Sequence, residues 1–276
     1  MRRRYGSYLH NLLVWPFTWS LFNPLIFAFT NSRLSRWLMK PYIFFGGVNM
    51  AEAEKPLATY QTIGELFCRR LQAGARPIDP SPEVISSPVD ATVIAWGKVR
   101  DTLTLQVKGE RYSVASLLGS AKLANCFLGG DYAVLYMKAG AYHHVHAPIS
   151  GYLVGAYQIP GRHFPLYHLS RQSIPGLYHR NTRQINLLTN YQQPPLALVQ
   201  VASTFVSSIY SNYPLAKKYT HPSYFTKGEE MGYFTFGSTV ILLFPPGVAT
   251  IELGDDTHDD PLLKMGEKLA IYYRGR

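Results

Sequence analysis

The chain has 276 residues, of which 47 % are hydrophobic and only 16 % are charged, and its formal net charge is +10. This apolar content excludes a wholly disordered chain, and two cysteines are too few for a disulfide framework. Aromatic residues make up 14 % of the chain. Low charge with many aromatic residues is typical of a protein that meets a lipid interface, and the positive charge predicts an anionic partner.

The first 55 residues combine basic charge with long apolar runs. Their seven Lys and Arg residues face only two acidic residues, and no Lys, Arg, Asp or Glu lies between Arg4 and Arg33. Pro16 and Pro24 interrupt the apolar run, which argues against a single helix that spans a membrane or packs in a core. No A-x-A site follows the run, which argues against a cleaved signal peptide. We expect amphipathic helices, broken at the prolines, that lie in a membrane interface.

Residues 56–276 have the pattern of a β-rich domain. Thr62 and Glu65 form a capping-box pattern before a helix-like run, and Gly74 is a plausible stop for that helix. Beyond it, short apolar runs alternate with Gly and Pro, which is typical of strands. We therefore expect an α+β fold, mostly antiparallel β, with a membrane-associating helical segment at 1–55 and one β-rich domain at 56–276.

A weak internal repeat suggests how the strands are arranged. SPVDATVIAWGKV at 87–99 aligns with APISGYLVGAYQI at 147–159, and both read as a Pro turn followed by a strand. Such paired strand entries resemble the two halves of a barrel-sandwich core. The alternative is that Pro before a strand is common turn chemistry.

Three histidines in the segment YHHVHAP are the densest cluster of chemically useful side chains. On a strand, His144 and His146 would share one face and His143 would point to the other, unless a bulge intervenes. A metal site would need further ligands at suitable spacing, and no Cys lies nearby. We therefore expect no metal.

Asp90 in SPVDATV and Ser238 in YFTFGSTVILLF could complete a set of orienting carboxylate, base and nucleophile with one histidine. Read alone, Asp90 is a turn aspartate, and Gly237 is a bulge or a close backbone approach. Ser238 follows this Gly, whose carbonyl is unhindered. The hydroxyl could attack that carbonyl in an N-to-O acyl shift.

These motifs together resemble the bacterial pyruvoyl-dependent phosphatidylserine decarboxylases along nearly the whole chain. The matching segments are ELFCRRLQAGARPID, SPVDATV, YHHVHAP, HLSRQSIPGLYHRN and KGEEMGYFTFGST. Two positions depart from the family pattern. Phe236 stands where the family usually has Leu, and His144 stands where it usually has Arg, so the role of His144 is open.

The resemblance implies a role for each site residue. Asp90 orients His146, His146 takes the proton of Ser238, and Ser238 attacks the carbonyl of Gly237. The chain then splits into a β chain, 1–237, and an α chain, 238–276, whose first residue becomes the pyruvoyl group. His143 matches the histidine that is linked to decarboxylation itself.

The resemblance also implies the cofactor and partners. The pyruvoyl group derived from Ser238 replaces pyridoxal phosphate as electron sink. The partners are phosphatidylserine, an anionic membrane and the two chains of one heterodimer, which could pair into a homodimer, with no nucleic acid. We expect peripheral attachment on the cytoplasmic side of the cell membrane. The alternatives are a membrane-associated Ser-His-Asp hydrolase that does not cleave itself, and a non-enzymatic carrier-type barrel.

Overall fold

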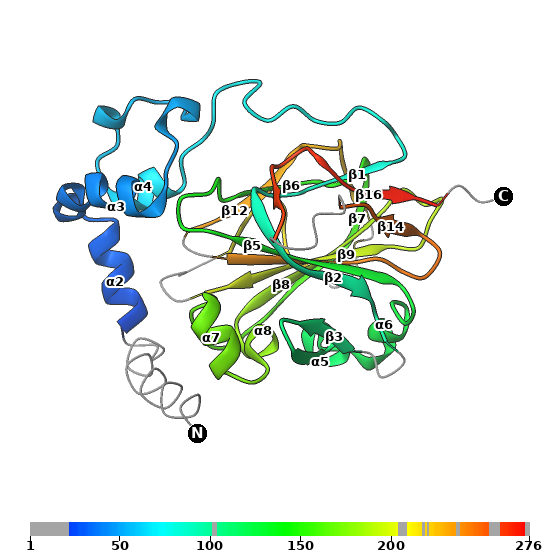
Figure 1. Cartoon of the computed structure of the whole chain (residues 1–276). Coiled ribbons are helices and arrows are strands. Elements are labelled where there is room, and N and C mark those ends of the chain that lie inside the picture. Colours follow the sequence, from blue (N-terminus) through cyan, green and yellow to red (C-terminus); the bar gives the residue numbers. More distant parts are fainter. Residues whose placement is uncertain are drawn as a thin grey trace.

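The computed structural model describes residues 22–100, 104–203, 209–216, 219, 221–235, 238–253 and 260–273. An antiparallel eight-stranded sheet, in the order β11-β7-β8-β9-β13-β5-β2-β15, crosses the middle of the molecule (Figure 1). Its strands are β2 (Ala91–Lys98), β5 (Asp131–Met137), β7 (Gly151–Ile159), β8 (Arg183–Thr189), β9 (Leu196–Ala202), β11 (Ser223–Phe225), β13 (Ser238–Leu243) and β15 (Leu262–Leu263). The expectation of mostly antiparallel β structure with a few helices is confirmed.

Smaller elements cover both faces of this sheet (Figure 1). On one face lie two three-stranded sheets, formed by β1 (Val84–Ser86), β16 (Lys268–Tyr272) and β14 (Ala249–Ile251), and by β10 (Ile209–Ser211), β12 (Glu230–Phe234) and β6 (His144–His146). On the other face lie β3 (Thr104–Val107), β4 (Glu110–Ser113), α5 (Val114–Leu118), α6 (Ala121–Asn125), α7 (His168–Ser173) and α8 (Leu177–Arg180).

Strand β13 shows how one sheet supports two cores. Val240 and Leu242 belong to the apolar cluster under the small sheets, whereas Ile241 and Leu243 belong to the cluster under the helices. Successive strand side chains alternate between faces, and both faces of β13 are buried at every position. This double burial explains why the sequence of β13 is apolar after its first two residues instead of alternating with polar residues.

The repeat in the sequence corresponds to two strands in equivalent places. Segment 87–99 contains β2 and segment 147–159 contains β7, and each strand is second from one end of the large sheet. Both strands carry an irregularity at matching positions, between Val93 and Ala95 in β2 and between Leu153 and Gly155 in β7. The two segments therefore share a local conformation as well as a sequence pattern.

The helix expected to run from Thr62 to Gly74 is shorter than its sequence pattern suggests. Its start is as expected, because the Thr62 side chain accepts a hydrogen bond from the Glu65 backbone N–H at 3.1 Å. Helix α4 covers only Ile63–Phe67, so the predicted stop at Gly74 is wrong. The following residues instead pair with an earlier part of the chain, where Leu71 forms an isolated antiparallel bridge with Ala53.

The described N-terminal residues form short helices at one end of the molecule (Figure 1). These are α2 (Phe22–Thr30), η2 (Arg33–Leu38), α3 (Met39–Gly46), η3 (Met50–Glu52) and η4 (Leu57–Thr59). Pro24 lies inside the described part of α2, while the break expected at Pro16 lies outside the described residues. Within the described ranges, no helix has both the length and the apolar composition that crossing a membrane requires.

Candidate functional site

Sheet pairing brings the histidine segment close to Ser238. Strand β6, which contains two of the histidines, pairs with β12, and β12 ends at Phe234, four residues before Ser238. The Phe234 backbone N–H donates to the His143 carbonyl at 3.0 Å. The histidines and the serine, almost a hundred residues apart in sequence, therefore meet because one strand pairs with the segment that leads to the other.

Ser238 is the first residue of β13 and is completely buried between β5 and β9. Its hydroxyl Oγ lies 3.0 Å from the Met137 sulfur Sδ, which is a weak acceptor. Gly237, the other half of the expected cleavage site, lies outside the described residues, as does Phe236. Within the residues that the structure describes, this buried hydroxyl therefore has no strong hydrogen-bond acceptor.

His146 has a defined tautomer because of its two ring partners. Its Nδ1 lies 2.8 Å from the Gly228 carbonyl, to which it can only donate, so Nε2 accepts from the Tyr142 hydroxyl at 3.1 Å. Burial lowers the His146 pKa, and it outweighs the Gly228 carbonyl and the nearby carboxylates of Glu230 and Asp90, which raise it. The ring is therefore neutral near pH 7, as a base must be.

Asp90 lies just before β2, at the same end of the sheet as Ser238, but its carboxylate is held by groups other than His146. Arg76 donates to it through Nε at 2.8 Å and through Nη2, and the Met265 backbone N–H donates to it at 2.9 Å. Arg76 also binds Glu52. The segment that contains Asp90 is joined to the histidine strand through the backbone, since the His146 N–H donates to the Pro88 carbonyl at 2.9 Å.

In the described part of the chain, no hydrogen bond joins Asp90 to His146 or His146 to Ser238. The three side chains therefore surround one region of the sheet end without forming a connected triad in the uncleaved chain.

His143 points away from His144 and His146, as the strand alternation predicts. Both of those rings contact Tyr142, the His144 ring stacked on it and the His146 ring tilted, whereas the His143 ring lies 3.9 Å from the Phe67 ring, centroid to centroid. Burial lowers the His143 pKa to about 3, although the Ala141 carbonyl bound to Nδ1 acts to raise it. Its Nε2 is buried and has no hydrogen-bond partner in the described part of the chain. The ring is neutral, and its proton lies on Nδ1, which donates to the Ala141 carbonyl.

The loop that leads into His143 is fixed by the N-terminal helices. Arg69 donates to the Gly140 carbonyl at 2.7 Å and to the Ala141 carbonyl at 3.3 Å. A Cβ added to Gly140 would lie 2.1 Å from the backbone oxygen of Gly46, at the end of α3. This close approach requires glycine at position 140.

His144 occupies the position at which the family pattern has Arg. Its Nε2 lies 3.1 Å from the Cys68 carbonyl and its Nδ1 lies 3.2 Å from a Glu230 carboxylate oxygen, and Arg70 binds the other oxygen of Glu230 at 3.0 Å. Burial would raise the Glu230 pKa, but contact with His144 and the neighbouring positive charges hold it below its ordinary value. Within the described residues, no His, Cys, Asp or Glu side chains gather into a metal-binding group of three or more.

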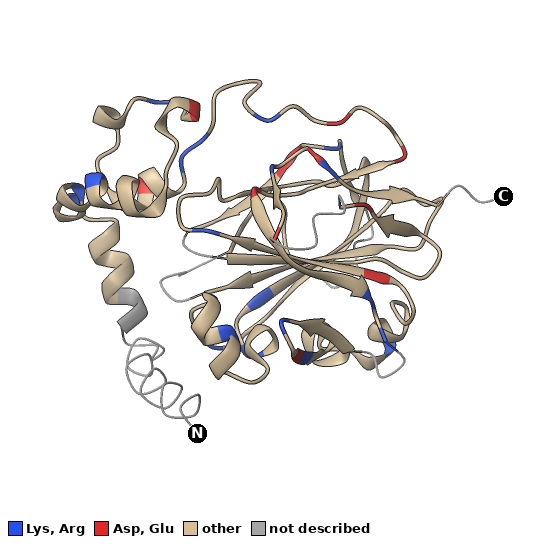
Figure 2. Cartoon of the chain, in the orientation of Figure 1, with Lys and Arg blue, Asp and Glu red and all other residues tan. Residues whose placement is uncertain are grey.

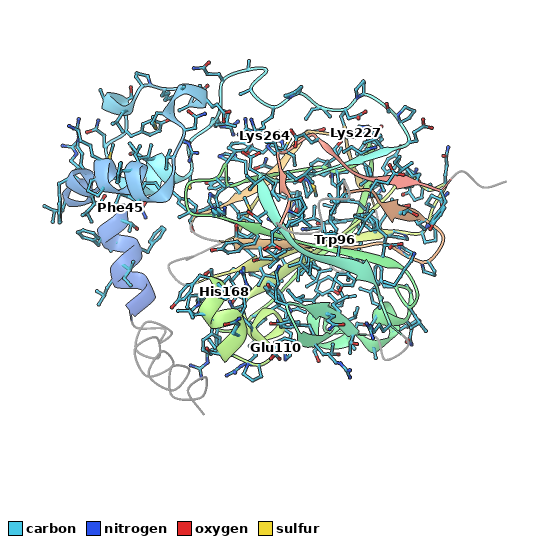
Figure 3. The ribbon with its side chains drawn as sticks, viewed as in Figure 1. Phe45, Trp96, Glu110, His168, Lys227 and Lys264 are labelled. Carbon is cyan, nitrogen blue, oxygen red and sulfur yellow. The ribbon has the colours of Figure 1, made fainter. Side chains whose placement is uncertain are left out.

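A small cavity of about 180 Å³ opens beside Asp90. Its lining includes Thr92 at the start of β2, Ala141 just before the histidine segment, and the two cationic side chains Lys138 and Lys264. Lys264 lies on the upper side of the large sheet in the view of Figure 3. The rest of the lining is Asp90 itself and the apolar side chains of Ala91, Leu262 and Leu263.

Sequence reasoning missed four residues that hold the site together. They are Arg76, Tyr142, Met137 and Glu230. Tyr142 stands inside the YHHVHAP motif and could have been included, because it lies an even number of residues before His144 and His146 on a strand. The other three pair across long sequence separations, for which a single sequence carries no signal.

Comparison with known proteins identifies the family. The family profile described as phosphatidylserine decarboxylase matches residues 63–271. The phosphatidylserine decarboxylase proenzyme of Geobacillus sp. (strain WCH70) is 35 % identical over 265 residues, which cover 96 % of this chain and 98 % of the relative. The proenzyme of Geobacillus kaustophilus (strain HTA426) is 36 % identical over 268 residues, covering 96 % of this chain and 97 % of the relative.

Both relatives are named as decarboxylase proenzymes, and the matches cover nearly the full length of both chains, so this protein is an enzyme of the decarboxylase class. The chain belongs to the phosphatidylserine decarboxylase family. The resemblance stated from the motifs is confirmed.

Proposed function

We propose that this chain decarboxylates phosphatidylserine to phosphatidylethanolamine and CO₂, using a pyruvoyl group that it makes by cleaving itself between Gly237 and Ser238. Family membership supports the reaction. The observation that supports the self-cleavage is the buried Ser238 hydroxyl, which lies in the first residue of a central strand and, among the described residues, has only the Met137 thioether as acceptor. If position 238 served only strand packing, an apolar residue would stabilise the protein more than Ser, because burying a hydroxyl without a strong acceptor costs free energy.

The proposed cleavage has three steps, which are ester formation, elimination and hydrolysis. The Ser238 oxygen bonds to the Gly237 carbonyl carbon while the peptide C–N bond breaks, which converts the amide into an ester. Removal of the Ser238 Cα proton then breaks the Cβ–O bond and leaves Gly237 as a free carboxylate. Water adds to the remaining unsaturated residue and ammonia leaves, so position 238 becomes the pyruvoyl end of the α chain.

His146 is the proposed base for this sequence. It is neutral because of burial, and its Nε2 is the nitrogen that accepts a proton, since Nδ1 donates to Gly228. Asp90 favours protonation of His146 through its charge. In this proposal, the Asp90 carboxylate orients His146 through its charge and without a hydrogen bond, and Arg76 holds that carboxylate in place.

For decarboxylation, the pyruvoyl carbonyl supplies the electron sink that stabilises the carbanion left by CO₂. His143 is the proposed group that returns a proton to the product. Its neutral ring carries its one proton on Nδ1, which donates to the Ala141 carbonyl, so Nε2 first takes up a proton that the substrate ammonium releases as it reacts and then passes it to the product. Within the described residues Nε2 is buried and has no hydrogen-bond partner, and Phe67 keeps the ring in a dry environment. The role of His144 in this proposal is to hold Glu230 and the Cys68 backbone.

The N-terminal helices are the proposed membrane contact, on the cytoplasmic side of the cell membrane. Phe44 and Phe45 are 80 % and 85 % exposed at the end of α3, and Figure 3 shows Phe45 at the end of the molecule formed by these helices. Arg33, Arg36 and Lys40 lie on the neighbouring turns, where Figure 2 shows basic residues. Exposed aromatic side chains beside basic ones suit an anionic membrane surface.

The remaining parts of the proposal concern organisation. We propose residues 1–55 as the membrane-associating segment and 56–276 as the catalytic domain, with a barrel-sandwich-like core in which β2 and β7 occupy equivalent places, each second from one end of the large sheet. Chains 1–237 and 238–276 stay together as a heterodimer, and two such heterodimers could form a homodimer.

Intact mass measurement and a denaturing gel test the self-cleavage. The purified wild-type chain should appear as two pieces, the smaller containing the last 39 residues of the 276, and Ser238→Ala should stay a single chain because no hydroxyl can attack. His143→Ala should still cleave itself yet lose decarboxylation. An uncleaved wild-type chain that reacts with a serine-directed phosphonate would instead indicate the hydrolase alternative.

A further inference from the structure

A buried arginine without an acidic partner lies under the large sheet, next to the start of β13. Arg171 in α7 is 8 % exposed and its guanidinium stacks over the Tyr136 ring, 4.6 Å from the ring centroid. It donates to the Leu166 carbonyl at 3.2 Å. Among the described residues, Arg171 takes part in no ion pair. A buried cation without a counter-ion is unfavourable, so a compensating anion is expected.

Several buried hydrogen-bonding atoms around Arg171 also lack partners among the residues that the structure describes. They are Arg171 Nε itself, the Ser170 hydroxyl, the Tyr178 hydroxyl and the Thr239 hydroxyl. Tyr178 is completely buried and close enough to Arg171 for the positive charge to act on its pKa. Buried polar atoms without partners are rare in folded proteins, and a group of them needs an explanation.

The sheet register places this cluster beside residue 238. Tyr136 on β5 lies directly opposite Thr239 on β13, and side chains of directly opposite residues share a face. Arg171, which covers Tyr136, therefore lies next to the residue that follows Ser238. Helix α7, which begins at His168, lies toward the same end of the molecule as the N-terminal helices (Figures 1 and 3).

From this arrangement we infer that Arg171, with the Tyr178 and Thr239 hydroxyls, forms a binding site for a phosphate ester. A guanidinium and neutral hydroxyls are donors that suit phosphate oxygens. The inference rests on the proposed function, in which the substrate carries a phosphodiester close to the amine that reacts at residue 238. The site would hold this phosphodiester on the side of the sheet opposite the histidines.

Kinetics of the self-processed full-length protein test the assignment to the headgroup. With phosphatidylserine in detergent micelles, Arg171→Gln should raise KM about tenfold or more and change kcat less, because a binding contact away from the reacting bond is lost. Arg171→Lys should recover part of the loss, and Tyr178→Phe, which removes one oxygen and keeps the ring, should raise KM about threefold. Self-cleavage should be complete in every variant.

Arg180→Gln is the matched control. Arg180 also stacks on an aromatic ring, that of Phe164 at 4.8 Å, but it is exposed and in the neighbouring helix α8. Its KM should equal that of the wild type. An unchanged KM in processed Arg171→Gln, or in Tyr178→Phe should Arg171→Gln not fold, would overturn the inference.

Titration calorimetry with inorganic phosphate gives a readout that needs no decarboxylation. The uncleaved Ser238→Ala chain should bind phosphate, and Ser238→Ala with Arg171→Gln should not. Absence of phosphate binding to the first chain contradicts an anion site. Binding that Arg171→Gln removes, together with a KM that it does not change, would show a site for free phosphate and contradict the headgroup assignment. If the wild type does not cleave itself, the proposed function has failed, while this titration still tests the anion site.

Discussion

At the scale of single residues, the two ring nitrogens of His146 have different partners, and these partners decide which nitrogen can take a proton. Nδ1 donates to the Gly228 carbonyl and Nε2 accepts from Tyr142. A hydroxyl that donates to the neutral ring stabilises the neutral form and opposes protonation. Tyr142 therefore adjusts the base without contacting Ser238 in the described structure.

Tyr142→Phe should shift the pH dependence of self-cleavage. Removing the donated hydrogen bond raises the pKa of His146, so the rate on the acidic side should fall and its midpoint should move up by about half a pH unit. The measurement is the cleavage rate of newly refolded protein between pH 5 and 9, followed on a denaturing gel. Tyr210→Phe, a change at a half-exposed tyrosine on β10, should leave the profile unchanged. A shift to lower pH would contradict the assigned direction of the hydrogen bond.

At this scale, the sequence predicts which way a side chain points better than it predicts which residue that side chain binds. Alternation on a strand correctly puts His144 and His146 on one face and His143 on the other, because that rule depends only on local backbone geometry. It cannot show that Gly228, 82 residues away, accepts from His146, or that Arg76 holds Asp90. Those contacts depend on how distant strands assemble.

At the scale of secondary-structure elements, the segment after α4 shows where a local pattern fails. The Thr62 cap sets the start of the helix as expected, since capping involves residues three apart. The helix ends early because the Glu54 N–H donates to the Arg70 carbonyl and the Gln72 N–H donates to the Glu52 carbonyl. These bonds place residues 70–76 beside 52–54, and this pairing delivers Arg76 to Asp90.

Arg76→Met should destabilise the protein and slow its cleavage. The Arg76 side chain is 7 % exposed and bridges Asp90 and Glu52, so its loss leaves two partly buried carboxylates without their cation. The expected cost is about 3 kcal/mol in the free energy of unfolding, measured by urea denaturation on the Ser238→Ala background so that only one chain is present. Arg70→Met removes an ion pair whose arginine is 59 % exposed and should cost less than about 1 kcal/mol. If Arg76→Met and Arg70→Met lower the free energy of unfolding equally, the buried bridge of Arg76 to Asp90 and Glu52 does not stabilise the protein more than an exposed ion pair.

At the scale of the whole molecule, exposed apolar side chains lie beside basic residues in the N-terminal helices, where Figure 2 shows Lys and Arg. Trp37, Phe44 and Phe45 are all more than 70 % exposed. The composition of the first 55 residues predicts such a surface, but only the fold shows that α3 also touches the loop before His143, through Gly46 and Gly140. The proposed membrane contact and the site are therefore physically connected.

Replacing both Phe44 and Phe45 by Ser should weaken binding to anionic vesicles. Each phenylalanine that enters the interface contributes on the order of 1 kcal/mol or more, so the fraction that sediments with phosphatidylglycerol vesicles should fall about tenfold. High salt should release more of the variant than of the wild type, because only electrostatic attraction remains. Tyr224→Ser changes an exposed aromatic residue on the edge strand β11 and should bind like the wild type. Undiminished sedimentation of the double variant would place the membrane contact elsewhere.

The position of β13 has a further consequence for the cleaved protein. This strand is hydrogen-bonded to β5 on one side and β9 on the other, whereas β16 pairs with β1 on one side and with β14, which follows β13 in the chain, on the other. Cleavage before Ser238 would leave a 39-residue piece whose first strand lies inside the large sheet of its partner, with further pairing between β15 and β2 and between β16 and β1. Unfolding then becomes a dissociation as well, and the unfolded pieces gain the entropy of separate molecules. The midpoint of denaturation of the cleaved form should rise with protein concentration, whereas that of the uncleaved chain should not.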